Sequence, residues 1–359
     1  MNSVVNEFEI KTNADIPEFV FNQEQSAQVI ESDSEALRIA KSLAADFKIE
    51  ASLRDQKRLL PLKEIVAFSQ SGLWGITIPK VYGGAQVKHQ TLSQVIRVLA
   101  SADPSIAQIS ENHLSFLEQV RLDATEAQKQ WIFREILKGH RLGNALSERG
   151  GKNVAELQTR IIWNPDIEKY TINGTKFYAT GSILAHWVYV VGLDENGQEL
   201  TALIPHDIDG LKIKNDWSGL GQRSTASGTV ELNNIVVDKE FVIATGAGGE
   251  PINLVGTISQ LIHSSIDAGI AHAAIEETIE FVKTYTRPWI DSEQELAVDD
   301  LFTQSAIAEL KIKLHAAEAL LDRAGDFIDQ ALSELNEETA NQATLAVAEA
   351  KVLSAEVAI

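Results

Sequence analysis

The sequence predicts a mainly α-helical protein with a central β domain, arranged as three consecutive parts. The first observation is that the hydrophobic period changes twice along the chain, from helical to strand-like and back to helical. The second is a group of short strand patterns and turn signals between these two changes. The third is that 359 residues, 44% of them hydrophobic, supply enough apolar surface for several packed layers. We therefore expect helices, then a sheet, then helices again.

Residues 1–33 are polar and weakly patterned, and we expect them to form an N-terminal extension. Residues 34–141 follow a helical apolar period, which predicts an N-terminal helical domain. One helix is expected to open near Ser34 and a second at Pro61, because proline is favoured in the first turn of a helix. A third is expected from Leu92 to Ala100.

The apolar period becomes two in residues 142–245, which predicts a middle β domain. Asn173-Gly174 has β-favouring residues on both sides, a pattern that predicts a two-residue hairpin turn at this point. A second hairpin is expected from Trp187–Leu193 and Leu200–Pro205, joined by a turn at Asp194-Glu195-Asn196-Gly197. The short spacing between these turns is typical of a small barrel or sandwich.

Helical patterning returns in residues 246–359, which predicts a C-terminal helical domain. The segment Gly246-Ala247-Gly248-Gly249 is interpreted as a linker between domains. We expect one long helix over about 258–285, rich in small residues that allow close helix packing, and further helices over about 300–331 and 337–359. The last pattern has no Gly or Pro stop signal, so we expect this domain to be truncated.

The formal net charge of −20 argues against nucleic-acid binding, because an acidic protein repels the phosphate backbone. The absence of cysteine excludes disulfides, thiolate catalysis and cysteine-ligated metals, and it fits a reducing cytoplasm. No clear metal-binding motif such as HExxH is found. The first thirty residues contain no apolar signal region, and no apolar run reaches the roughly 18 residues that span a bilayer. We therefore expect a cytoplasmic protein that binds neither nucleic acid nor membrane.

No residue pattern names a chemistry by itself. The signatures of serine hydrolases, zinc proteases and phosphate-binding loops are absent from the sequence. Taken alone, His113 is interpreted as a packing or hydrogen-bonding histidine, and Arg287 as a charge at the C-terminus of a long helix. Redox or carbon chemistry would need an imported cofactor, and a cleft between domains is where such ligands often bind.

Five segments, in the same order, resemble the acyl-CoA dehydrogenase superfamily. They are Ser71–Gly84, Ala102–Ser105, Lys138–Glu148, Asn173–Ser182 and Leu220–Gly228. The first carries a Gly-Leu…Pro…Tyr-Gly-Gly pattern, the second is Ala-Asp-Pro-Ser, and the last contains Gly-x-Arg-x-x-x-Ser. This resemblance implies an acyl-CoA dehydrogenase-like fold in which the middle domain is a β-barrel between two helical domains. It also implies a flavin cofactor and a homotetramer with the C-terminal helices packed between subunits.

Within the superfamily, the sequence is most similar to the sulfur-acquisition oxidoreductases, which include dibenzothiophene-type monooxygenases. Ser147-Glu148-Arg149-Gly150-Gly151-Lys152 departs from the dehydrogenase pattern Thr-Glu-Pro-x-x-Gly-Ser-Asp. Arg287-Pro288-Trp289 replaces an Arg-x-x-Phe-Gly segment, and losing Phe-Gly puts the hold on the adenine half of FAD in doubt. The resemblance therefore favours FMN over FAD.

The reaction that this branch implies is oxygenation by reduced flavin, FMNH2, supplied by a separate NAD(P)H-flavin reductase. Oxygen would add at flavin C4a, and the C4a-hydroperoxide would transfer one oxygen atom to a small organosulfur compound. An apolar, closed pocket would suppress wasteful release of peroxide.

The resemblance also implies a set of site residues. His113 falls where the monooxygenase branch places a histidine near the flavin, so it is the catalytic candidate. Arg287 would bind the flavin phosphate, an interaction that could cross a subunit interface. Trp217 is a candidate for the substrate pocket, although it and Tyr178 could equally be core aromatics of the β domain. The remaining cofactor-binding candidates are Asn144, Ala145, Leu146, Ser147, Tyr178, Thr180 and Ser182.

Two other functions stay open at this point. The first is an FAD-dependent acyl-CoA dehydrogenase that oxidises an acyl-CoA thioester. Its catalytic carboxylate would lie after the last helix, outside the sequence in hand. The second is a non-catalytic helical interaction protein, which would bind no flavin in either redox state.

Overall fold

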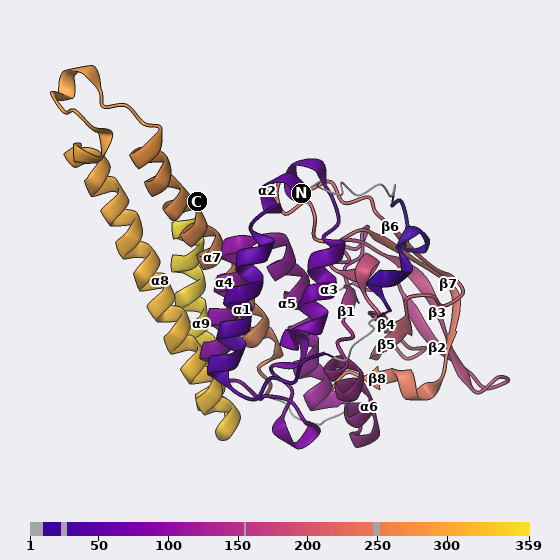
Figure 1. The fold of residues 1–359 in the computed structure, drawn as a ribbon. Coiled ribbons are helices and arrows are strands. Elements are labelled where there is room, and N and C mark those ends of the chain that lie inside the picture. Colours follow the sequence, from indigo (N-terminus) through magenta and orange to yellow (C-terminus); the bar gives the residue numbers. More distant parts are fainter. Residues whose placement is uncertain (1–9, 23–26, 154–155, 247–251) are drawn as a thin grey trace.

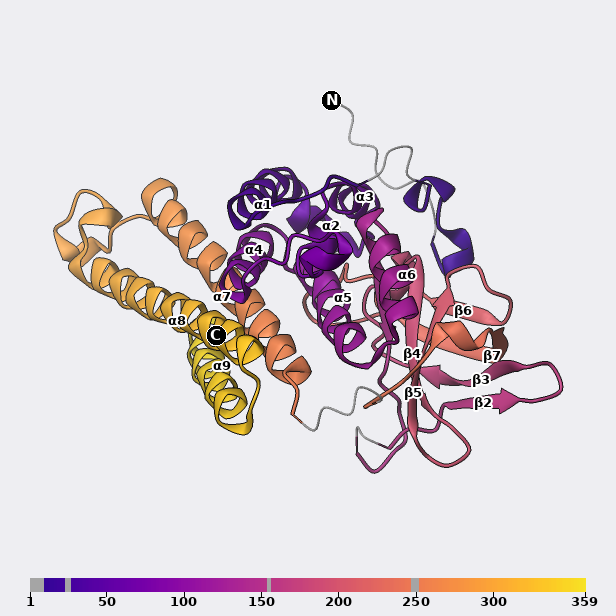
Figure 2. The ribbon, with the colours of Figure 1, turned by 90° about the horizontal axis from the view of Figure 1, so that it is seen from below.

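The structure, a computed structural model, describes residues 10–22, 27–153, 156–246 and 252–359. Helices, a sheet and further helices follow one another along the chain, which confirms the predicted fold class. Figures 1 and 2 show the N-terminal helices between the sheet on one side and the C-terminal helices on the other. Residues 247–249 of the predicted linker lie outside the described residues.

The N-terminal helices form a compact group around α4 and α5. They are α1 (Asp33–Phe47), α2 (Ala51–Lys57), α3 (Leu62–Gln70), α4 (His89–Ala102), α5 (Pro104–Asp123) and α6 (Glu126–Leu137). The start of α5 is defined by Asp103, whose Oδ1 accepts hydrogen bonds from the backbone N–H groups of Ser105 and Ile106. The other carboxylate oxygen of Asp103 accepts from the buried guanidinium of Arg54 at 2.8 Å. This double use of Asp103 places the first turn of α5 against α2.

The strands of the described residues belong to one sheet. They are β1 (Leu142–Ala145), β2 (Arg160–Asn164), β3 (Lys169–Lys176), β4 (Trp187–Leu193), β5 (Glu199–Pro205), β6 (Leu211–Lys214), β7 (Thr229–Val237) and β8 (Val242–Ala244). Their order in the sheet is β6-β7-β3-β2-β4-β5-β8, and β1 pairs in parallel with β4. The predicted hairpin of Trp187–Leu193 and Leu200–Pro205 is confirmed as β4 and β5.

The predicted hairpin turn at Asn173-Gly174 is wrong. Strand β3 runs straight through both residues, pairing with β2 on one side and β7 on the other, with a register shift between Ile172 and Gly174. A Cβ atom on Gly174 would lie 2.2 Å from Thr159 Oγ1, so glycine serves a close backbone approach here. The chain instead turns between β2 and β3, where Glu168 has a positive φ of 52°.

The described part of the predicted N-terminal extension packs on the sheet and on the N-terminal helices, where the backbone N–H of Gln28 donates to Gln70 O at 2.8 Å. Thr12 forms a bridge with Lys214 at the edge strand β6. The side chain of Asn13 donates to His206 O at 3.1 Å and accepts from the backbone N–H of Ile213 at 2.9 Å. Val20 is fully buried. The polar composition gave no indication of this packing, which combines hydrogen bonds of Asn13 with the burial of Ile16, Val20 and Ile30.

The C-terminal helices are α7 (Val255–Thr284), α8 (Leu301–Ser333) and α9 (Glu337–Ala358), close to the expected bounds. Small residues let α7 approach α4, since a Cβ on Gly269 would lie 2.6 Å from Arg97 O, and the hydroxyls of Ser93 and Ser265 are 2.8 Å apart. Figure 1 shows the far ends of α7 and α8 projecting beyond the rest of the molecule. Among the helices in the described ranges, none is both long and apolar enough to cross a membrane.

Candidate functional site

A cavity of about 490 Å³ lies where α5 and α7 meet the sheet, and we call it the α5–α7 cavity. From α5 it is lined by Gln108, Glu111, Asn112, Ser115, Phe116 and Gln119. From the sheet and its loops it is lined by Leu146, Thr180, Tyr189, Val191 and Glu199. From α7 it is lined by Val255, Gly256, Ser259 and His263. Its volume is within the range of small-molecule and cofactor sites.

A buried carboxylate joins the two helices at this cavity. Glu111 is only 2% exposed, and its Oε1 accepts hydrogen bonds from Ser115 Oγ at 2.9 Å and from Ser259 Oγ at 2.8 Å. His263 Nδ1 lies 3.4 Å from the same oxygen and 3.0 Å from Ser259 O. Because these groups bind one another, the polar wall is held in one arrangement.

A second polar group connects α5 with the first strand. Asn144 Nδ2 donates a hydrogen bond to Asn112 Oδ1, and the hydroxyl of Tyr189 donates to Asn112 O at 3.4 Å. The Tyr189 ring stacks on Phe116 with 4.2 Å between centroids and an interplanar angle of 4°. Burial raises the pKa of Tyr189 well above its ordinary value, so its hydroxyl stays protonated. Asn144 therefore does not line the cavity itself but binds Asn112, which does.

The loop after β1 is anchored by a buried ion pair. Lys176 Nζ donates to Glu148 Oε1 at 2.6 Å and to Leu146 O at 3.1 Å, and its side chain is fully buried. Glu148 also accepts hydrogen bonds from two backbone N–H groups of the chain before β2. The Ser147 carbonyl accepts from the Phe177 N–H at 2.8 Å. These bonds fix the backbone of Ala145–Ser147 while the Leu146 side chain stays 45% exposed.

The turn after β3 faces the loop after β1. The backbone N–H of Asn144 donates to Thr180 O at 3.1 Å, and Ser227 Oγ donates to Thr180 Oγ1 at 3.2 Å. The hydroxyl of Ser182 is buried and donates to Ala179 O at 2.7 Å. Thr180 therefore lies in the cavity lining. Ser182 does not line the cavity, but its hydrogen bond to Ala179 O stabilises the same turn.

The two predicted aromatics lie beside this turn and outside the cavity lining. Tyr178 has a positive φ of 54° and is 53% exposed, so it is not a core residue. Its ring meets Trp217 edge to face at 5.8 Å, and Trp217 Nε1 donates to Gln222 O at 3.0 Å. The guanidinium of Arg149 lies over the Phe177 ring at 4.1 Å. Together these side chains form an exposed aromatic and cationic edge next to Thr180.

His113 points away from the cavity, into the N-terminal core. Its Nε2 lies 2.9 Å from Trp74 O, and its Nδ1 accepts from the backbone N–H of Leu142 at 3.0 Å. Burial lowers the pKa of His113 to about 3, so the ring is neutral and carries its proton on Nε2. Both nitrogens are used by backbone groups, and the ring connects α5 to the start of β1.

Acidification is expected to destabilise the protein through its buried histidines. Burial lowers the pKa of His113 to about 3, that of His186 to about 2 and that of His206 to about 4. The unfolded chain takes up these protons near pH 6.5, so stability is fully present above pH 6.5 and falls as the pH drops below it. Each fully neutral histidine contributes up to about 1.4 kcal/mol per pH unit in this window.

Urea unfolding between pH 7.5 and 5.0 measures this loss. The variant His113→Gln, which cannot titrate, should show a shallower decline of unfolding free energy with falling pH than the parent chain. Equal slopes for the two proteins would contradict the buried-histidine explanation.

Arg287 is not brought to the cavity within one chain. It follows the C-terminal end of α7, whereas Val255 and Gly256 line the cavity at the other end. The 30 residues of this helix span about 45 Å. Arg287 lies instead with Trp289 and Phe302 at the projecting tip.

Sequence reasoning missed the polar residues that line the α5–α7 cavity, Glu111 and Asn112 above all. A signal was present, because Gln108, Glu111, Asn112, Ser115 and Gln119 recur at helical spacing and form a polar stripe along one face of α5. The partners of this stripe on α7 could not be found in the same way. Ser259 and His263 are far away in the sequence and meet Glu111 only after the helices pack.

Comparison with known proteins places this arrangement in a family. The family profiles acyl-CoA dehydrogenase N-terminal domain, middle domain and C-terminal domain match residues 36–140, 144–235 and 261–359. A dibenzothiophene monooxygenase of Rhodococcus erythropolis is 28% identical over 301 residues, covering 80% of this chain and 72% of that protein. The probable FMNH2-dependent monooxygenase SfnC of Pseudomonas putida is 30% identical over 325 residues, covering 88% and 80%.

Solved structures give the same result. FMN-bound TdsC from Paenibacillus sp. A11-2 superposes with a TM-score of 0.82 at 29% identity, covering 90% of this chain and 84% of that one. Methanesulfinate monooxygenase MsuC from Pseudomonas fluorescens gives a TM-score of 0.82 at 28% identity, covering 90% and 83%. With three consecutive family profiles and the helix–sheet–helix order, the chain belongs to the acyl-CoA dehydrogenase family.

Proposed function

We propose that this protein is a monooxygenase that uses reduced FMN to oxygenate a small organosulfur compound, with the flavin ring in the α5–α7 cavity. The observation that carries the proposal is the position of this cavity, between α5, α7 and the loops after β1 and β3. Relatives named for FMNH2-dependent or organosulfur oxygenation cover most of the chain and support the choice of reaction.

The residues present fit a flavin ring. The backbone of Ala145–Ser147 is held rigid by the Lys176–Glu148 pair, and the half-exposed Leu146 side chain offers an apolar surface. A flavin is flat and apolar on its faces but carries hydrogen-bonding atoms along its edges. Thr180 and the Asn112–Asn144 pair supply polar groups for such an edge.

Reduced FMN, when bound, supplies the two electrons with which one atom of O2 becomes water while the other joins the sulfur of the substrate. Thr180 is the residue that we assign to the flavin edge. Ser227 donates to its oxygen, and the only acceptor for its own proton among the described residues, Tyr178 O, is at a long 3.5 Å. The Thr180 hydroxyl therefore has a proton to donate to an acceptor in the cavity.

We assign His113 a positioning role. Because both of its ring nitrogens bind backbone groups, it has no free proton to deliver at the cavity. Its bond to Leu142 N–H fixes the start of β1, whose last residues are Asn144 and Ala145. Ser182 acts in the same indirect way, through its bond to Ala179 O in the turn that carries Thr180.

The test supplies the protein with FMN, an NADH-dependent flavin reductase, NADH and oxygen, together with a panel of sulfides, sulfones and sulfinates. We expect oxygenated product only when both FMN and the reductase are present. A copurifying FAD that acyl-CoA bleaches would replace this proposal with an acyl-CoA dehydrogenase. Failure to bind either flavin, oxidised or reduced, would favour a non-catalytic interaction protein.

We further propose that the protein works as a homotetramer in the cytoplasm, where a separate NAD(P)H-flavin reductase supplies FMNH2. The support for assembly is the projecting tip of α7 and α8. It exposes large apolar side chains that a partner copy would cover: Phe281, Tyr285, Trp289, Ile290 and Phe302. In such an assembly Arg287, which lies at this tip, would bind the FMN phosphate in the cavity of a neighbouring copy.

Arg287→Ala is expected to weaken FMN binding about tenfold, because it removes a charge-assisted hydrogen bond to the phosphate. Fluorescence titration with FMN measures the effect, and riboflavin, which has no phosphate, should bind both proteins equally. Lys283→Ala, an exposed cation near the same end of α7, is the matched control. Unchanged FMN affinity in Arg287→Ala would remove Arg287 from the site.

A further inference from the structure

A histidine and a buried carboxylate meet at the wall of the α5–α7 cavity, on the two helices that enclose it. Among the histidines of the described ranges, His263 of α7 alone lines this cavity, and Glu111 lines it from α5. His263 Nδ1 lies 3.0 Å from Ser259 O and 3.4 Å from Glu111 Oε1. A carbonyl oxygen can only accept a hydrogen bond, so Nδ1 carries the proton of the neutral ring.

The other ring nitrogen, Nε2, is therefore the one that offers a lone pair. It has no hydrogen-bond partner within the part of the chain that the structure describes, and the His263 side chain is 41% exposed. Glu111 is fixed instead, because its Oε1 accepts from the hydroxyls of Ser115 and Ser259 at 2.9 and 2.8 Å. A fixed carboxylate beside Nδ1 orients the imidazole and stabilises its charged form, as in hydrolases that use a Ser-His-Asp triad.

The other titratable side chains at this cavity are less suited to exchanging a proton with a bound molecule. Tyr189 stays protonated, because burial raises its pKa well above the ordinary value. Glu199 is exposed, and no hydrogen bond orients its carboxylate among the described residues. Asp267, one helical turn after His263, does not line the cavity. No lysine or arginine belongs to the lining either.

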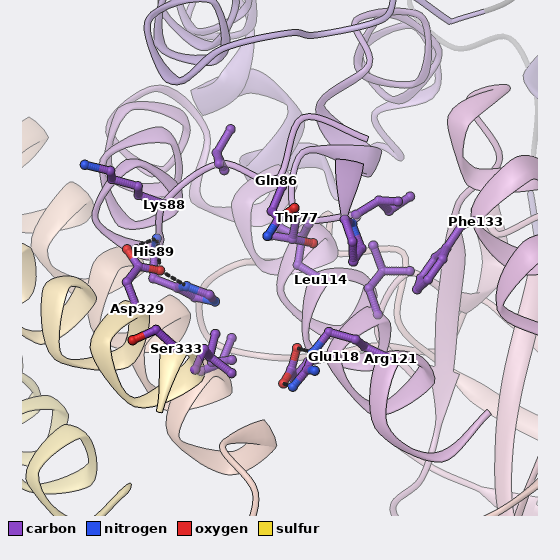
Figure 3. Close-up of a pocket in the computed structure, with 16 residues that line it drawn as sticks. Thr77, Gln86, Lys88, His89, Leu114, Glu118, Arg121, Phe133, Asp329 and Ser333 are labelled. Atoms are coloured by element: carbon purple, nitrogen blue, oxygen red, sulfur yellow. Dashed lines mark hydrogen bonds and ion pairs between the residues drawn. The ribbon is translucent and has the colours of Figure 1, made fainter. Parts of the chain in front are cut away.

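A second histidine–carboxylate pair shows what a purely structural arrangement looks like in this fold. His89 and Asp329 line a different cavity, of about 330 Å³, which shares no lining residue with the α5–α7 cavity (Figure 3). Asp329 accepts from the backbone N–H of His89 and lies 2.6 Å from its Nδ1, so the pair joins α4 to α8. The His89 side chain is only 11% exposed. His263 differs because its free nitrogen is accessible.

We propose that His263 is the acid–base residue of the oxygenation reaction and that Glu111 is its positioning residue, an inference that rests on the proposed function. In the overall reaction a sulfide, O2 and FMNH2 become the S-oxide, water and FMN. The S–O bond forms, the O–O bond breaks, and the second oxygen atom leaves as water. His263 Nε2 takes one of the two protons that FMNH2 releases and gives it to the departing oxygen. The histidine ends neutral, so the balance is unchanged.

The tautomer is tested without flavin and without turnover. Solid-state nitrogen-15 NMR of protein labelled in its histidines distinguishes the two neutral tautomers, and the His263 signals are those missing from His263→Ala. We expect His263 to carry its proton on Nδ1. A neutral ring with its proton on Nε2 would overturn the proposal, because that nitrogen could not then accept a proton.

The role in the reaction is tested by the oxygenated product and hydrogen peroxide formed per NADH, in the assay with FMN and the reductase. His263→Ala should lower product formation about 100-fold or more, the usual effect of losing a general acid–base group, and divert oxygen to peroxide. Imidazole added in solution should restore part of the product. His272→Ala is the matched control, because His272 lies on the same helix, 3.6 Å from Glu318 and outside the cavity, at 45% exposure.

Glu111→Gln tests the positioning role. Product should fall about tenfold or more, as for loss of a hydrogen bond to a charged group, and imidazole should not restore it. The double variant with His263→Ala should be no worse than His263→Ala alone, because Glu111 acts through His263. If the parent chain forms product and His263→Ala forms as much per NADH, this inference is wrong and the proposed function stands. A parent chain without product would overturn the proposed function, and this inference with it.

Discussion

Lys176→Met is expected to lower the free energy of unfolding by about 3–5 kcal/mol, the usual cost of removing one partner from a buried ion pair. The Lys176 side chain is fully buried, and Glu148, at 6% exposure, would be left without its cation. The same change would release Leu146 O and with it the loop after β1. We therefore expect FMN binding to weaken as well as stability to fall.

Chemical unfolding and FMN titration of the same samples measure the two effects. The matched control is Lys169→Met, which breaks an exposed ion pair with Asp238 at 3.0 Å and should cost less than about 1 kcal/mol. The double variant Lys176→Met with Glu148→Met should recover part of the lost stability, because no buried charge is left unpaired. If Lys176→Met is as stable as Lys169→Met, the anchoring role of the pair is wrong.

Gly256→Trp is expected to reduce FMN-dependent turnover about 100-fold or more while the fold is retained, since displacing bound reactants by about 1 Å can already cost that much. Gly256 lines the α5–α7 cavity, and a Cβ atom built on it meets no heavy atom within 4 Å. The indole would therefore extend into the space assigned to flavin and substrate. Glycine is also the weaker helix former, so the substitution should not destabilise α7.

The comparison is with Ala45→Trp, which adds the same ring to an exposed position of α1. Product formation and FMN affinity are measured for both variants, with circular dichroism to show that each is folded. Loss of activity in Gly256→Trp alone supports the location of the cavity. Full activity in Gly256→Trp would mean that the flavin lies elsewhere.

Helical parts of the fold could be predicted closely because they depend on local period. The long helix expected over 258–285 is α7, and the two later helices also lie within a few residues of their expected bounds. The prediction of a hairpin at Asn173-Gly174 was wrong because this glycine allows a close approach to Thr159. Thr159 lies before β2 in the sequence but next to Gly174 in the folded protein. A turn signal and a close-approach signal look the same in the sequence.

The site residues also divide into those that a local sequence motif identifies and those whose contacts form only when the chain folds. Leu146 and Thr180 line the α5–α7 cavity, and each belongs to a short contiguous motif that can be recognised in the sequence. The partners of His113 could not, since they are the backbone atoms of Trp74 and Leu142 on other elements. Only packing decides whether a histidine in an apolar helix faces a cavity or the core. On the same helix, the polar residues Glu111 and Asn112 indicate the cavity better than His113 does, because they line it and His113 does not.

The origin of the oxygen atom in the product tests the central claim most directly. The protein, FMN, the flavin reductase, NADH and an organosulfur substrate are incubated under oxygen-18 gas in ordinary water, and the product is analysed by mass spectrometry. We predict one oxygen-18 atom in each newly oxygenated product molecule, and no label when the gas is ordinary and the water is labelled. Product oxygen that comes from water, or an absence of product together with reduction of bound flavin by acyl-CoA, would contradict the assignment as a reduced-flavin monooxygenase.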